Sequence, residues 1–127
     1  MISRKHIELQ AVDMTEGWQT PPGFPAGMQA KILSGNLDEE RKTGSRTRLM
    51  RFQPGTCGAE PIVHEFWEEV YVVSGDFIAV DRNGRHLQSY PPNTYTCRPP
   101  GVWHGPFKSE SGCLLLEIHY FDPDGSC

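Results

Sequence analysis

Glycine and proline interrupt this chain so often that short strands, rather than helices, are the elements it can best form. The 127 residues include 13 glycines and 11 prolines. Both residue types break helices and mark turns, and several of the segments between them are rich in β-branched and aromatic residues. The sequence therefore predicts one all-β domain over residues 1–127, built as a closed or two-layered antiparallel structure.

Six segments carry strong strand signals. They are residues 7–12, 29–33, 46–52, 77–87, 93–98 and 112–121. The segment 77–87 is predicted to be a hairpin, because its Asn83-Gly84 pair favours the positive φ angles of a two-residue primed turn. The segment 7–12 is expected at the edge of a sheet.

The charge and hydropathy of the chain exclude several classes of partner. The formal net charge is −4 and the pI is near 5.7, so no basic surface for nucleic acid or an anionic membrane is expected. No apolar run approaches the roughly 20 residues that span a bilayer, and the N-terminal residues lack a signal-peptide pattern. The four cysteines form no Cys-x-x-Cys pair and are expected to be reduced thiols. We therefore expect a cytoplasmic protein.

Two stretches carry residues that bind metals. The first runs from His64 to Gly75 as His-Glu-Phe-Trp-Glu-Glu-Val-Tyr-Val-Val-Ser-Gly, and the second is Pro-Pro-Gly-Val-Trp-His, ending at His104. Because His64 and Glu68 are four residues apart, they share one face of a strand. Two neutral imidazoles and one carboxylate can hold a divalent metal and leave other coordination positions open. The two stretches therefore predict a metal site formed by His64, Glu68 and His104.

A helical interpretation of the first stretch fails. The pattern His-Glu-x-x-Glu is similar to the zinc-peptidase helix motif His-Glu-x-x-His, but the second histidine is missing. The run 70–73 that follows, Val-Tyr-Val-Val, favours a strand, because β-branched and aromatic side chains suit a pleated surface. His64 and Glu68 are therefore expected on or beside a strand.

The two stretches resemble the paired signature motifs of the cupin superfamily. In the first motif, His64, Glu68 and Gly75 stand at a histidine, glutamate and glycine of the cupin pattern. The second motif ends in Pro-x-Gly-x-x-His, and residues 99–104 match it. The resemblance covers residues 53–107. It implies an RmlC-like jelly-roll barrel, the double-stranded β-helix of small single-domain cupins.

Two positions depart from the cupin pattern. Ile62 stands where a first histidine is expected, and Asn93 stands where a glycine is expected. Asparagine tolerates a positive φ angle, so a turn at Asn93 is still feasible. The remaining ligands, His64, Glu68 and His104, form a two-histidine, one-carboxylate set. Such a set suits Fe(II), with Zn, Mn or Ni as alternatives, and a cupin that has lost its metal is the other outcome.

Further side chains are candidates for substrate binding or for an extra ligand. Alternation along the last strand places Glu117 and His119 on one face, which points either to solvent, as we expect, or into a polar cavity. In a cavity, His119 would be a fourth ligand or an acid–base group. Tyr71 is either a core tyrosine or a substrate contact.

Two arginines and a second glutamate complete the candidates. Arg46 and Arg48 alternate along one strand and are expected on the surface, with their stems laid on apolar residues. If that face lines the barrel, either arginine could anchor a carboxylate or enolate through its planar fork, and Arg48 is the one we name as a candidate. Glu69 competes with Glu68 as the acidic ligand, and the spacing to Gly75 favours Glu68.

Three functions follow from these residues and the resemblance, and no catalytic residue is assigned. The chain is similar to small diketone and hydroxyketone dioxygenases, which implies metal-dependent, dioxygenase-like chemistry on a small organic substrate; isomerases and lyases also occur among such cupins. It is also similar to the cupin domain of zinc-dependent anti-sigma factors, which implies a metal sensor. A metal-free barrel that binds a small molecule is the third function. The edge strand and the resemblance predict a homodimer.

Overall fold

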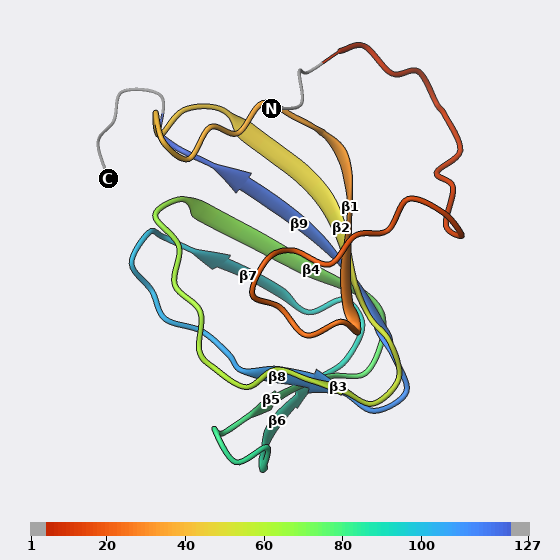
Figure 1. The fold of residues 1–127 in the computed structure, drawn as a ribbon, viewed down its shortest axis with the longest axis vertical. Coiled ribbons are helices and arrows are strands. Elements are labelled where there is room, and N and C mark those ends of the chain that lie inside the picture. The colour runs from red at the N-terminus through yellow and green to blue at the C-terminus, as the bar shows by residue number, and fades with distance from the viewer. Residues whose placement is uncertain (1–4, 123–127) are drawn as a thin grey trace.

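The fold consists of short antiparallel strands joined by turns. The computed structural model describes residues 5–122, and within them there are strands and turns but no helix (Figure 1). The strands are β1 (Met28–Gly35), β2 (Ser45–Phe52), β3 (Thr56–Cys57), β4 (Trp67–Gly75), β5 (Phe77–Val80), β6 (His86–Tyr90), β7 (Tyr95–Arg98), β8 (Phe107–Ser109) and β9 (Cys113–Tyr120). The predicted all-β class is therefore confirmed.

Two sheets form the layers of the molecule. One sheet has five strands in the order β1-β2-β9-β4-β7, and the other has four in the order β3-β8-β5-β6. In the first sheet, β9 lies between β2 and β4, although these strands are far apart in the chain. This order brings the first metal-binding stretch next to the last strand (Figure 1).

The core lies mainly on the inner face of the five-stranded sheet, and Phe77 joins it from the other sheet. Side chains alternate along a strand, so every second residue points inward. The core cluster comprises Met28, Ala30, Met50, Phe52, Val70, Val72, Phe77, Cys113 and Leu115. Beyond this apolar layer, the inward positions of β2, β4 and β9 are polar, and these residues form the site described below.

Gly75 ends β4 where the chain passes very close to β9. It has a φ of +85°, and a Cβ atom at this position would lie 2.0 Å from the carbonyl oxygen of Gly112. Only glycine meets both conditions without strain. The glycine at the end of the first stretch therefore has a structural role.

The hairpin at residues 77–87 is present, but its turn differs from the predicted one. Strands β5 and β6 pair as expected, and Gly84 has a φ of +80°. Asn83 does not have a positive φ, so the two-residue primed turn is wrong. The side chain of Asp81 accepts hydrogen bonds from the amides of Asn83 and Arg85, and these bonds stabilise a longer loop.

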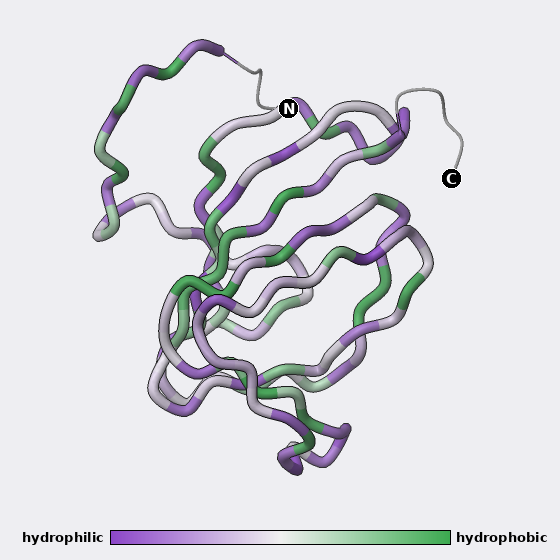
Figure 2. The backbone as a smooth tube through the Cα atoms, turned by 180° about the vertical axis from the view of Figure 1, so that it is seen from behind, coloured by the Kyte–Doolittle hydropathy of each residue, from purple (hydrophilic) through white to green (hydrophobic). Residues whose placement is uncertain are grey.

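The predicted edge strand at residues 7–12 is also wrong. This segment has no strand, is exposed, and extends away from the sheets (Figures 1 and 2). Alternation of apolar and polar residues suits a strand, but a strand forms only where its backbone finds a partner. The described part of the chain supplies no such partner here.

The structure describes three of the four cysteines. Cys57, Cys97 and Cys113 are free thiols, and Cys127 lies outside the described residues. Among residues 5–122, no helix has the length and apolar character needed to cross a membrane.

The homodimer stays a prediction, and the outer face of the five-stranded sheet is the surface on which to test it. Tyr71, Val73 and Tyr95 expose 39%, 43% and 56% of their surface there. We expect light scattering after size exclusion to give twice the 14.3 kDa mass of the chain. Val73→Arg should give a monomer, whereas Leu87→Arg, at an exposed apolar residue of β6, should not. A wild-type monomer would contradict the prediction.

Candidate metal centre

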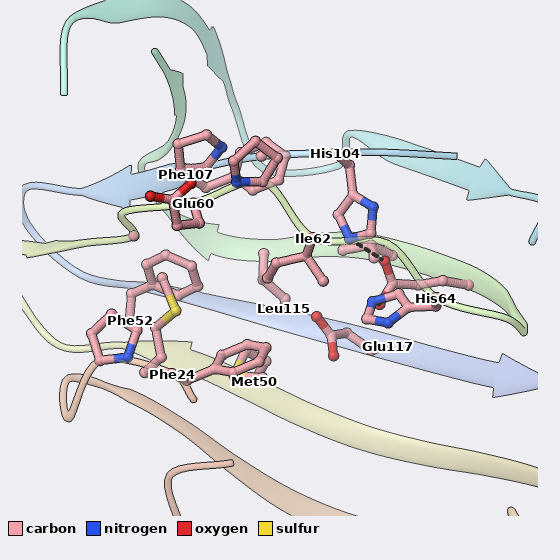
Figure 3. Close-up of a pocket in the computed structure, with 18 of the residues that line it drawn as sticks. Phe24, Met50, Phe52, Glu60, Ile62, His64, His104, Phe107, Leu115 and Glu117 are labelled. Atoms are coloured by element: carbon pink, nitrogen blue, oxygen red, sulfur yellow. Dashed lines mark ion pairs between the residues drawn. The ribbon is translucent and has the colours of Figure 1, made fainter. Parts of the chain in front are cut away.

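Backbone hydrogen bonds hold the two metal-binding stretches together. Ile62 and His104 form an antiparallel bridge, in which each amide donates to the other residue's carbonyl at 2.8 and 2.9 Å. The amide of Gly101 donates to the carbonyl of His64 at 2.9 Å. The imidazoles of His64 and His104 therefore lie near each other, with ring centroids 5.0 Å apart (Figure 3).

Strand β4 supplies the carboxylate. Glu68 is 4% exposed and faces inward, opposite Arg98 of β7 and His119 of β9 in the strand register. Glu69 points to the outer face, where the hydroxyl of Tyr95 donates to it. Glu68 rather than Glu69 is thus the carboxylate that the fold brings to the histidines.

The three predicted ligands converge. Glu68 Oε1 lies 3.3 Å from His104 Nε2, and Glu68 Oε2 lies 3.6 Å from His64 Nε2. One ligand atom from each residue lies within 4.8 Å of those of the other two. This is the two-histidine, one-carboxylate set expected from the sequence, and such a set can hold a divalent metal.

Both imidazoles are neutral at pH 7. Burial lowers the pKa of His64 to about 4 and also lowers the pKa of His104, because desolvation disfavours the charged ring. The neutral ring is the form that binds metals.

The surroundings of His104 also suit a cation. Its Nδ1 lies 3.3 Å from the carbonyl oxygen of Val102, which can only accept, so we assign the proton of the neutral ring to Nδ1. The unprotonated Nε2 therefore faces Glu68 Oε1 at 3.3 Å. Two lone pairs facing each other at this distance repel, and a cation between the residues relieves that repulsion.

His119 has the opposite tautomer. Two guanidinium nitrogens of Arg46, Nε and Nη2, lie 3.1 and 2.8 Å from His119 Nδ1, and guanidinium nitrogens can only donate. Nδ1 therefore accepts, and the proton of the neutral ring is on Nε2, which donates to Glu68 Oε2 at 2.8 Å. Burial lowers the pKa of His119 to about 3, so the ring stays neutral. In this arrangement His119 orients the metal-binding carboxylate, and its nitrogen has no lone pair free for a metal.

Glu68, Glu117 and His119 also lie close enough to hold an ion, but the proton on His119 Nε2 leaves this group without a histidine lone pair. Glu117 Oε1 accepts from Arg48 Nε at 2.8 Å, and both side chains are 9% exposed. Arg48 already pairs with Glu117, the other carboxylate of this group. The donor set therefore fits one metal, at His64, Glu68 and His104.

A cavity of about 530 Å³ opens beside this centre. His64, His104 and Glu117 gather at one end of it, and Phe24, Met50 and Phe52 lie toward the other (Figure 3). Its volume is in the range of small-molecule sites. The remaining lining is mostly apolar and includes Met28, Ile62, Val70, Phe77, Phe107 and Leu115.

Several sequence-based interpretations need correction. Glu117 and His119 share a face, as predicted, but it points into the interior, where they are 7% and 0% exposed. The outer face carries Leu114, Leu116 and Ile118 instead, and these three side chains are half-buried.

Arg48 and Tyr71 are also not where the sequence placed them. Arg48 is 7% exposed and lines the cavity rather than the surface. Tyr71 lies on the outer face of β4, where its hydroxyl donates to Asn93, and the structure does not bring it to the centre. Asn93 has a φ of +70°, as the expected turn requires.

Sequence reasoning missed Arg98 and the role of Arg46. Arg46, expected on the surface, instead binds His119, and Arg98 donates to Glu68 Oε1 at 3.1 Å. Only the pairing register of β2 and β9 would have revealed the contact of Arg46. In this register Arg46 pairs with His119, and Arg48 pairs with Glu117. That register is not visible in the sequence.

The sequence and the fold were compared with known proteins. No curated protein sequence matches this chain. KdgF from Halomonas sp. superimposes with a TM-score of 0.62 and 22% identity, covering 89% of this chain and 94% of that one. An RmlC-like cupin from Shewanella frigidimarina NCIMB 400 gives a TM-score of 0.64 at 19% identity, covering 93% and 95%.

An acetylacetone dioxygenase from Acinetobacter johnsonii gives a TM-score of 0.58 at 18% identity, covering 99% of this chain and 87% of that one. These likenesses show the cupin jelly-roll fold, as predicted. The sequence matches the family described as the ChrR cupin-like domain over residues 9–120. The chain therefore belongs to the ChrR cupin-like family.

Proposed function

We propose that this protein binds one divalent metal through His64, Glu68 and His104 and uses it in dioxygenase-like chemistry on a small organic substrate. The observation that supports this most is the convergence of His64, Glu68 and His104, whose ligand atoms all lie within 4.8 Å of one another. Fe(II) suits a two-histidine, one-carboxylate set with open positions, with Zn, Mn and Ni as alternatives. A bound metal supplies Lewis-acid polarisation of a substrate oxygen or, as iron, a centre that binds O₂.

The protein's own residues would hold and shield this chemistry. Arg98 and His119 each donate to one oxygen of Glu68 and so orient the carboxylate. The lining around Ile62 and Leu115 would give the centre an apolar wall on the cavity side. Each neutral ring, of His64 and of His104, has one unprotonated nitrogen that could bind the metal.

Metal loading and oxygen uptake test the proposal. We expect protein loaded anaerobically with Fe(II) to hold about one iron per chain, by elemental analysis, and to consume O₂ when acetylacetone or a hydroxyketone is added. The likeness to an acetylacetone dioxygenase is the reason for the first substrate. Stoichiometric iron with no O₂ uptake across the panel would contradict the dioxygenase-like function.

A non-catalytic sensor or binding cupin is the alternative, and the ChrR cupin-like family match favours it. In that case, the freshly purified protein would hold zinc and turn over none of the substrates. A protein that holds no metal in either experiment would be a metal-free binding barrel.

A further inference from the structure

The charges in the cavity leave no protein group to neutralise a metal. Glu117 already pairs with Arg48 at 2.8 Å, and Glu68 pairs with Arg98 at 3.1 Å. Glu60 also lines the cavity, but its side chain is 75% exposed and lies 3.8 Å from Arg82. The two buried carboxylates are therefore already paired with arginines. A divalent metal would add two positive charges that no further buried carboxylate balances. An unbalanced charge in a buried site is costly unless a counter-ion joins it.

Arg48 offers donors to such a counter-ion. Among the described residues, its Nε donates to Glu117. Its two terminal nitrogens remain for another acceptor. No buried side-chain nitrogen or oxygen in residues 5–122 lacks a hydrogen-bond partner, so those terminal nitrogens are in contact with solvent rather than sealed in the protein. Arg48 lines the cavity, and its planar fork matches a pair of oxygens.

The surroundings of Arg48 strengthen its attraction for anions. A second cavity, of about 460 Å³, lies against the same residue, beside residues 17–22. Its charged lining residues are Lys31, Arg46 and Arg48, and no acidic side chain lines it. Glu117 is the acidic side chain that pairs with Arg48, and the second cavity adds no other acidic group beside it.

The rest of the main cavity suits an apolar body. Phe52, Phe77 and Phe107 line it, and Phe77 lies 5.8 Å from the ring of Phe52 and 4.4 Å from that of Phe107. Aromatic walls of this kind bury the apolar part of a small ligand.

We propose that the cavity takes a small organic anion whose charge is spread over a planar pair of oxygens, as in a carboxylate. Its oxygens bind Arg48 beside the metal centre, and its apolar body packs against the three phenylalanines. This inference rests on the proposed function, because the metal supplies part of the positive charge. It also names the substrate class that the proposed function leaves open.

Matched acids and amides test the proposal in the wild-type protein. The probes are benzoate against benzamide, and 3-methylbutanoate against its amide, titrated calorimetrically into protein loaded with zinc. Each amide keeps the shape of its acid and removes the charge. We expect at least one acid to bind at least about tenfold more tightly than its amide, since a hydrogen bond to a charged group is worth about 1.5–3 kcal/mol.

Variants then locate the anion. Arg48→Lys keeps the charge beside Glu117 but removes the fork, and should weaken the acid at least about tenfold while zinc stoichiometry is unchanged. Arg41→Gln is the matched control, because its side chain is 84% exposed and it changes net charge away from the cavity. If Arg48→Lys does not fold, the double variant Arg48→Gln, Glu117→Gln removes both charges of the buried pair and gives the same measurement.

The possible failures are distinguishable. A wild-type protein that holds no metal overturns the proposed function and this inference with it. A protein with stoichiometric zinc that binds neither acid, or binds acid and amide equally, overturns the inference alone. Unchanged acid binding in the Arg48 variant also overturns it.

Discussion

Replacing His64 and His104 together with alanine should abolish stoichiometric metal binding and leave a folded barrel. The change removes two of the three ligands, so the metal affinity should fall by more than the roughly 10–100-fold that loss of an outer partner costs. Neither residue belongs to the apolar core cluster, and both precede or follow strands rather than lie within them. Elemental analysis and a thermal unfolding curve measure the two effects separately.

The matched control for the double variant is His86→Ala. His86 is exposed on β6, where its ring contacts Ser89, and it is far from the centre in the strand order. Metal content should be unchanged in this control. Stoichiometric metal in the double variant would contradict the ligand assignment.

Replacing His119 with leucine should weaken metal binding by roughly 10–100-fold, the usual cost of losing a group that orients a ligand. His119 is 0% exposed, so its loss removes the hydrogen bond to Glu68 Oε2 and leaves the guanidinium of Arg46 without its acceptor. Unfolding free energy should also fall, by about 1–3 kcal/mol for the unpaired donor. Competition with a chelator measures the affinity, and chemical denaturation measures the stability.

Two further variants separate orientation from simple destabilisation. His119→Gln retains an N–H donor that can reach Glu68, so it should recover part of the affinity that leucine loses. Val72→Ala removes a buried core side chain away from the cavity and should lower stability without changing metal affinity. The absorption spectrum of the cobalt-loaded protein should shift in His119→Leu and not in Val72→Ala. Equal affinity in the glutamine and leucine variants would contradict the orienting role.

Some of the site was predictable because it depends on local spacing. His64 and Glu68 share a strand face by their separation alone, and the Pro-Pro-Gly bend before His104 limits where that ring points. The choice of Glu68 over Glu69 followed from the distance to Gly75, where the close approach of Gly112 requires a glycine.

The identity of the orienting groups was not predictable in this way. Arg46 reaches His119, and Arg48 reaches Glu117, only because β2 and β9 pair in one register. The tautomers of His104 and His119 follow from the neighbours of Nδ1, a carbonyl in one case and a guanidinium in the other. Each of these neighbours is brought to its ring by the folded chain.

By itself, the sequence determined that the chain forms short strands, which residues share a strand face, and that two histidines and a glutamate stand in a cupin pattern. Only the tertiary structure decided which face of β9 points inward. Alternation along a strand separates its residues into two faces but does not tell which face points inward. Here Leu114, Leu116 and Ile118 occupy the outer face, while Glu117 and His119 are buried. The interior accepts these polar groups because arginines of β2 satisfy their hydrogen bonds, and that condition exists only once the sheet is assembled.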